Sequence, residues 1–135
     1  MTVRLPKNEG RHISDAYDVA RIMQKILLRQ NKLHRNKEYF WTIGLNNQND
    51  IEYIELVAIG TNNRMILAPV DIFSFAVAKK CKKVIFCHNH PSGNLSPSKA
   101  DIQFTKDMDK AAIILGIKML DHLIISENDY SKISF

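Results

Sequence analysis

The 135-residue sequence is long enough for one hydrophobic core, and its hydrophobic fraction of 45% and charged fraction of 24% exclude a disordered chain. No apolar run approaches the length that spans a bilayer, and residues 1–10 lack the apolar stretch of a signal peptide. We therefore expect a cytoplasmic protein that does not bind a membrane. The formal net charge of +5 comes partly from two basic clusters, at residues 32–37 and 79–83. We interpret these clusters as solvated helix ends in preference to a nucleic-acid-binding surface, because basic charge alone carries little specificity.

The first half of the chain predicts a helix followed by a β-hairpin. Residues 14–30 carry apolar side chains at helical spacing, with Ser14 or Asp15 as a suitable N-cap. Residues 39–45 and 51–59 are rich in aromatic and β-branched side chains and flank a short polar run. Such a pair of segments is typical of two antiparallel strands joined by a turn.

The second half alternates helices with strands. After a turn at residues 60–64, Pro69 can begin a second helix that runs to about residue 80, because its fixed φ and missing N–H cost nothing at that position. The short apolar run at residues 84–88 suits a buried strand. Residues 118–126 form the last predicted strand.

A third helix is expected between the loop at residues 89–97 and Gly116. Its predicted buried stripe consists of Phe104, Met108, Ala111 and Leu115. The whole pattern predicts one α/β domain over residues 1–135, with helices packed around a single sheet. The two cysteines, Cys81 and Cys87, form no C-x-x-C pair, so we expect both to be buried free thiols.

The most informative side chains follow the strand at residues 84–88. His88 and His90 are two positions apart on an extended chain, so they project to the same side. The loop then leads into a helix whose first turn holds Ser98 and Asp101, and sites in open α/β sheets lie where strands end and helices begin. Asp101 can therefore return beside the histidines. Two imidazole nitrogens and one carboxylate oxygen suit Zn²⁺ and leave a fourth position for water.

Each part of this pattern also has a simpler explanation. A His-x-His pair on a strand is more often incidental than metal-binding. Ser98 and Asp101 also form a capping-box pair, in which the serine and the acid satisfy the first N–H groups of a helix. The ligand types, their number and their direction together favour a zinc site held by His88, His90 and Asp101.

A catalytic zinc site also needs a base that takes a proton from water, and a carboxylate is the usual choice. Glu52 lies beside the polar turn of the hairpin, where we expect it to be solvated. Glu55 lies between Ile54 and Leu56, where an unpaired carboxylate is costly to bury, so we predict that Glu55 is the base. The alternative for Glu55 is an edge-strand position that faces solvent.

These residues resemble a known family. His88-x-His90-Pro91, followed by Ser98 and Asp101, is similar to the JAMM motif of JAB/MPN metalloproteases. More narrowly, residues 39–126 resemble the catalytic domain of the bacterial RadC family. The features that carry this resemblance are His88-Asn89-His90-Pro91-Ser92-Gly93, Pro97-Ser98-x-x-Asp101, the segment from Glu55 to Gly60-Thr61, and Leu120-Asp121-His122.

The resemblance implies a curved mixed β-sheet flanked by helices, as in JAB and cytidine-deaminase-like domains. It also implies zinc ligands at His88, His90 and Asp101, a role for Glu55 in acting on the water, and a role for Ser98 in holding an oxyanion. Full-length RadC proteins usually carry an N-terminal helix-hairpin-helix region, whereas an amphipathic helix opens this sequence. The family often has Pro-Arg-Glu where this sequence has Pro69-Val70-Asp71.

The leading functional hypothesis is a zinc-dependent hydrolase that cleaves a peptide or isopeptide bond in a protein or peptide substrate. A DNA-associated RadC-like protein, either a metal-dependent nuclease or a binding module, is the alternative, and it predicts DNA affinity that falls steeply with salt. A structural zinc domain is a third hypothesis, and it predicts that chelation unfolds the protein. The consecutive His-Asn-His letters do not match HNH nucleases, where the three residues are dispersed. A homo-oligomer is compatible with every one of these hypotheses.

Overall fold

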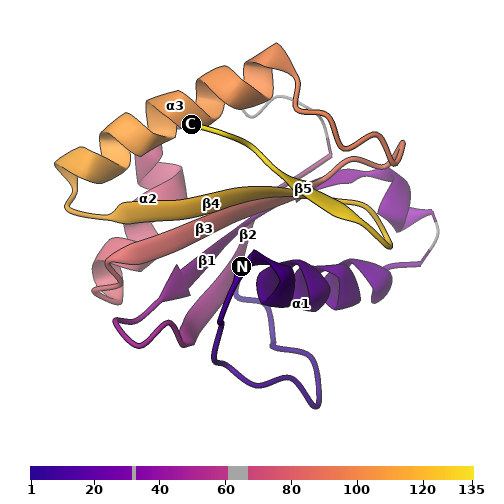
Figure 1. The fold of residues 1–135 in the computed structure, drawn as a ribbon, viewed down its shortest axis with the longest axis horizontal. Coiled ribbons are helices and arrows are strands. Elements are labelled where there is room, and N and C mark those ends of the chain that lie inside the picture. Colours follow the sequence, from indigo (N-terminus) through magenta and orange to yellow (C-terminus); the bar gives the residue numbers. More distant parts are fainter. Residues whose placement is uncertain (32, 61–66) are drawn as a thin grey trace.

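The fold is that of a computed structural model, which describes residues 1–31, 33–60 and 67–135. A five-stranded sheet of order β2-β1-β3-β4-β5 forms its centre (Figure 1). In chain order the elements are α1 (Ala16–Leu28), a 3₁₀ helix (His34–Asn36), β1 (Glu38–Leu45), β2 (Ile51–Gly60), α2 (Pro69–Ala78), β3 (Lys83–Asn89), α3 (Lys99–Ile114), β4 (Lys118–Ile125) and β5 (Tyr130–Lys132). The predicted mixed sheet flanked by helices is therefore confirmed.

The central strands set the position of the site. β1 pairs in antiparallel fashion with both β2 and β3, and Phe40 lies between Ala58 on one side and His88 on the other. β3 and β4 are parallel, and α3 makes the crossover between them. The first turn of α3 therefore follows the carboxyl end of β3 after one loop.

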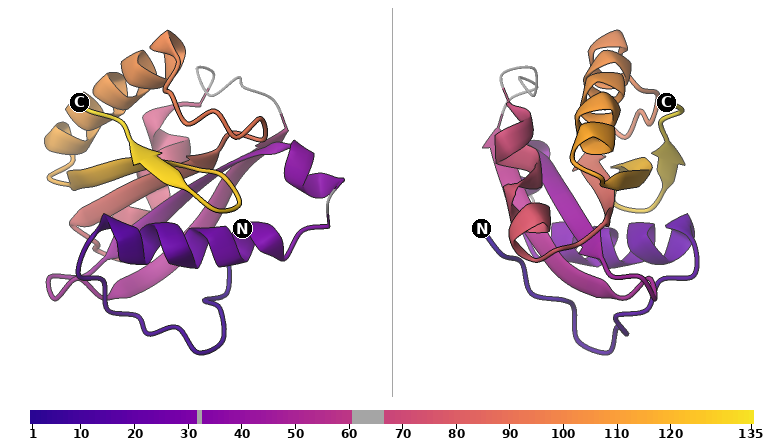
Figure 2. Two further views of the ribbon diagram at one scale, coloured as in Figure 1. Left: turned by 45° about the vertical axis from the view of Figure 1, so that its right-hand side comes forward. Right: turned by 90° about the vertical axis from the view of Figure 1, so that its left-hand side faces the viewer.

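Helices cover both faces of the sheet (Figure 2). α1 packs on one face in a cluster of mostly aliphatic side chains, which includes Ile22, Ile43 and Leu123. α2 and α3 pack on the opposite face, where the cluster is rich in aromatic rings: Phe40, Tyr53, Phe73, Phe86 and Phe104. Because strand side chains alternate, each strand contributes to both cores.

The helix boundaries follow the predicted caps closely. Asp15 is the N-cap of α1, and its side chain accepts a hydrogen bond from the Asp18 N–H at 3.1 Å. Pro69 is the first residue of α2, as predicted. Gly116 follows α3 with a φ of +73°, a conformation that glycine adopts without strain. Cys81 and Cys87 are both buried free thiols, as expected.

The predicted buried stripe of α3 was wrong at its last position. Leu115 is the C-cap and is 47% exposed, whereas Ala112 is fully buried one turn earlier. β5 and the 3₁₀ helix were not predicted from the sequence. The turn predicted at residues 60–64 lies outside the described residues after Gly60.

Within the described part of the chain, no helix is both long and apolar enough to cross a membrane. Lys79, Lys80 and Lys82 are exposed just after the end of α2, which is the solvated helix end that the sequence favoured for this basic cluster.

Candidate metal centre

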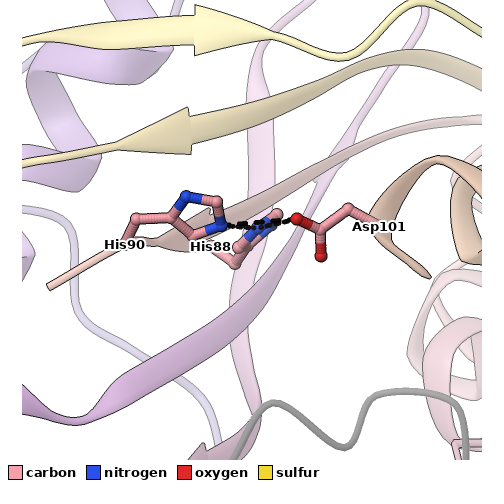
Figure 3. Close-up of side chains that lie close together, drawn as sticks. All are labelled: His88, His90 and Asp101. Atoms are coloured by element: carbon pink, nitrogen blue, oxygen red, sulfur yellow. Dashed lines mark hydrogen bonds and ion pairs between the residues drawn. The ribbon is translucent and has the colours of Figure 1, made fainter. Parts of the chain in front are cut away.

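The end of β3 brings two imidazoles together. His88 is the penultimate residue of the strand, and its ring stacks near that of Phe40 with the centroids 6.3 Å apart. The His90 N–H donates to the Ile125 carbonyl at 3.0 Å, so the chain stays extended along β4 beyond the last residue of β3. The two side chains therefore project to the same side, and their Nε2 atoms lie 3.1 Å apart (Figure 3).

Asp101 completes the group from the first turn of α3. Its Oδ2 atom lies 3.3 Å from His90 Nε2 and 3.6 Å from His88 Nε2. Ser98 is the N-cap of the helix: its N–H donates to Asp101 Oδ2, and its Oγ accepts from the Asp101 N–H, both at 3.0 Å. The predicted capping box is thus confirmed, and the same carboxylate faces the histidines. The helix cap fixes the Asp101 side chain where the histidines need it.

The three atoms have the spacing of a tetrahedral metal site. Zn²⁺ bonds of roughly 2.0–2.1 Å place neighbouring ligand atoms about 3.3–3.4 Å apart in a tetrahedron. The distances of 3.1, 3.3 and 3.6 Å bracket that value. Two imidazole nitrogens and one carboxylate oxygen are also a common donor set with one open position. His88, His90 and Asp101 could therefore hold a metal ion.

The carboxylate of the cluster is buried, and the pKa values of Asp101 and His90 are both shifted. Asp101 is only 2% exposed. Burial alone would raise the pKa of the Asp101 carboxyl, but the contacts with His88 and His90 and the Ser98 N–H outweigh it and hold the pKa far below its usual range. The pKa of His90 is raised, chiefly by its contact with the Asp101 carboxylate. The two imidazoles therefore stabilise the charged form of the Asp101 carboxylate.

The ring of His90 is oriented from its outer side. Its Nδ1 atom lies 2.7 Å from the carbonyl oxygen of Asn94. Because a carbonyl only accepts hydrogen bonds, Nδ1 carries the proton in the neutral ring. In that neutral ring Nε2 carries the lone pair that a metal ion would bind, whereas in the protonated ring, which the raised pKa favours, Nε2–H donates to Asp101.

Two hollows have His90 in their lining. The smaller, of about 430 Å³, is lined by Asn36, Glu38, Gly60, His90, Pro91, Ser92, Ser98 and Asp101. The larger, of about 600 Å³, shares Asn36, His90, Pro91 and Ser92 with it and continues toward residues 126–129. His90 therefore lines both hollows, and Asp101 lines the smaller one.

The structure places the predicted base, Glu55, away from these hollows. Glu55 pairs with Thr42 in the sheet, and its Oε2 lies 4.0 Å from the amino nitrogen of Met1. Its side chain is 16% exposed, so it does not simply face solvent, and burial raises its pKa. Neither hollow beside His90 has Glu55 in its lining.

A different acid, Glu38, lines the smaller hollow with Ser98 and Asp101. It is the first residue of β1, and after Asp101 and Asn94 its charge also helps to raise the pKa of His90. Glu38 was not among the carboxylates that the sequence offered as the base, which were Glu52 and Glu55. The sequence contains only a weak indication of its role. Glu38 directly precedes the strand predicted at residues 39–45, and that strand lies beside the one that carries His88.

Comparisons with known proteins agree with this geometry. The RadC-like JAB domain model matches residues 13–135. The UPF0758 protein of Finegoldia magna is 45% identical over 92 residues, which cover 68% of this chain and 41% of that protein. The UPF0758 protein of Clostridium botulinum strain Loch Maree is 41% identical over 120 residues, which cover 87% of this chain and 50% of that protein. The chain thus spans half or less of the length of these relatives.

The family match includes every element that builds the metal centre, from α1 to β5. It therefore agrees with the resemblance read from the histidine, serine and aspartate spacing, and the chain belongs to the RadC-like JAB domain family.

Proposed function

We propose that this domain is a zinc-dependent hydrolase that cleaves a peptide or isopeptide bond. The observation that carries the proposal is the group of His88, His90 and Asp101, whose three ligand atoms have tetrahedral spacing beside a hollow. A structural zinc site is closed by four protein ligands, whereas a catalytic one uses three. Membership in the JAB domain family supports the same type of site.

The residues around the centre divide the work of hydrolysis. Zinc held by the three ligands would supply a Lewis acid and lower the pKa of a water molecule. Glu38, in the lining of the smaller hollow, is placed to take the proton from the attacking water and return it to the leaving amine. Ser98 Oγ accepts from the Asp101 N–H, so its own proton can be directed into the hollow toward a developing oxyanion.

Glu38 and Glu55 are the two candidates for the base. Sequence position favoured Glu55, whereas the lining of the hollow favours Glu38. The test compares Glu38→Gln with Glu55→Gln, measuring bound zinc and the hydrolysis of a panel of fluorogenic peptides and isopeptide-linked substrates. We expect Glu38→Gln to bind zinc normally and to lose about 10²–10⁴-fold in rate, and Glu55→Gln to stay active.

The opposite pattern of rates would assign the base to Glu55. Wild-type protein that takes up no zinc at a stoichiometric concentration, or that binds zinc and hydrolyses nothing in the panel, would overturn the proposed activity.

The DNA-associated alternative is motivated by the RadC resemblance and by the basic charge. Among the described residues of the cluster at 32–37, Arg35 pairs with Glu127 at 2.6 Å, which neutralises part of that charge. DNA binding is therefore the weaker hypothesis. A titration of DNA affinity against salt tests it, because a surface that contacts several phosphates loses affinity steeply as salt rises.

A further inference from the structure

A chain of buried hydrogen bonds lies behind the metal centre. His88 Nδ1 is 2.7 Å from His122 Nε2, and His122 Nδ1 is 2.7 Å from Thr105 Oγ1. Thr105 Oγ1 in turn donates to the backbone carbonyl of Asp101 at 2.7 Å. His88, His122 and Thr105 are fully buried. The chain therefore starts at one predicted metal ligand and ends on the backbone of another.

The last bond fixes the direction of the others. A carbonyl oxygen only accepts, so the single hydroxyl proton of Thr105 points at Asp101. Thr105 Oγ1 must then accept from His122 Nδ1–H, which leaves His122 Nε2 as an acceptor in the neutral ring. His122 Nε2 accepts from His88 Nδ1–H, and the lone pair of His88 Nε2 is left facing Asp101 and His90.

Phenylalanine rings pack against this chain. Phe40 and Phe86 meet the ring of His122 edge to face, with centroid distances of 5.8 and 5.5 Å. The His88 ring stacks near Phe40 of the same aromatic cluster. Both ring nitrogens of His122 have a partner in this chain, so its ring is held in one orientation.

We propose that His122 and Thr105 are positioning residues that set the tautomer of His88, so that its Nε2 is free of a proton and ready to bind the metal. If the hydroxyl of Thr105 is removed, His122 can carry its proton on Nε2 instead. His88 must then accept at Nδ1 and carry its proton on Nε2, where it blocks the ion. The inference relies on the proposed metal site, and it explains why a histidine from β4 lies behind the ligand from β3.

The first experiment measures zinc affinity by competition with a chromophoric chelator. We expect Thr105→Val to weaken zinc binding by roughly 10–100-fold, the usual effect of losing a partner of a ligating histidine. Thr105→Ser keeps the hydroxyl and should restore affinity to within about threefold of wild type. Thr42→Val is the matched control, because Thr42 is equally buried and lies in β1 outside the hydrogen-bonded chain.

The second experiment needs no variant. Long-range ¹H–¹⁵N spectra of metal-free wild-type protein report which ring nitrogen of His88 carries the proton, and we expect Nδ1. A proton on Nε2, or equal zinc affinity of Thr105→Val and wild type, would overturn the inference. Wild-type protein that binds no zinc while His88 shows the Nδ1–H tautomer would instead overturn the proposed function alone.

Discussion

The two faces of the sheet are built differently, although the same strands supply both. The face under α1 is packed mostly with aliphatic side chains, with Tyr39 and Trp41 stacked at its margin. The face under α2 and α3 combines phenylalanine rings with buried polar groups, among them His88 and His122. Strand alternation assigns Cys87 to the first face and His88 to the second. The face under α1 therefore contributes to stability alone, whereas the face under α2 and α3 contributes to stability and also holds the candidate metal ligand His88.

Several polar groups of the second face hydrogen-bond to one another. The hydrogen bonds from His88 through His122 and Thr105 end on a helix carbonyl, so both ring nitrogens of His122 have a partner within the protein. Four substitutions test this difference between the faces.

Asp101→Asn should remove the metal centre while leaving the helix start in place. Asparagine can still accept the Ser98 N–H, but it lacks the charge that a cationic ion requires. Chelator competition should show a loss of zinc affinity that exceeds the roughly 100-fold upper range for a supporting partner. Asp107→Asn, an exposed change on the same helix, is the control. Tight zinc binding by Asp101→Asn would remove Asp101 from the ligand set.

Ile22→Ala should weaken the α1 face without disturbing the metal. Ile22 is fully buried in the aliphatic cluster, and the truncation leaves a cavity there. Urea denaturation should show a loss of about 2–4 kcal/mol in the free energy of unfolding. Ile114→Ala, at a highly exposed position, should change it by less than about 0.5 kcal/mol. A large drop in zinc affinity of folded Ile22→Ala would show that the faces are energetically coupled.

Gly44→Ala tests the packing of the second face far from the ligands. A Cβ at this position would lie 1.9 Å from Cε2 of the Tyr53 ring, so the ring must move. We expect a destabilisation of about 1–3 kcal/mol by thermal or urea unfolding. Gly10→Ala meets no atom within 4 Å and serves as the control. Equal stability of the two variants would show that the Tyr53 ring moves away at little cost.

Glu55→Gln should produce the smallest change in the free energy of unfolding, and whether the variant is more or less stable than wild type depends on pH. Burial raises the pKa of Glu55 above its ordinary value of 4.5, so the folded protein binds this proton more tightly than the unfolded chain does. The free energy of unfolding therefore falls as pH rises from below 4.5 through the raised value, and the glutamine variant lacks this fall. At pH 7 the variant should be more stable by less than about 1 kcal/mol. An identical difference from wild type at pH 4 and pH 7 would contradict this assignment.

Much of the geometry of the candidate metal centre could be predicted from local rules. The two-residue period of a strand placed His88 and His90 on one side, and the position of Asp101 in the first turn of a helix brought it back to them. These relations need only a short stretch of sequence. The ligand geometry was therefore accessible before the fold was known.

The surroundings of the ligands could not be predicted in this way, because they depend on long-range strand pairing. Thr42, the sheet partner of Glu55, lies beside Phe86, while Phe40 lies beside His88. Glu55 is thus paired two residues along β1 from Phe40, the residue that lies beside His88. His122 reaches His88 only because β4 lies parallel to β3 in a particular register. Nothing in the local sequence specifies that register.

Asp101 has two tasks, and their combination has a dynamic consequence. The carboxylate that caps the first turn of α3 is also the one that faces the two histidines. An ion that holds this carboxylate also holds the first turn, which in a free helix is among the easiest parts to fray. Metal loading should thus slow amide hydrogen exchange at the start of α3 much more than in α1, so that the helix terminus reports on occupancy of the site.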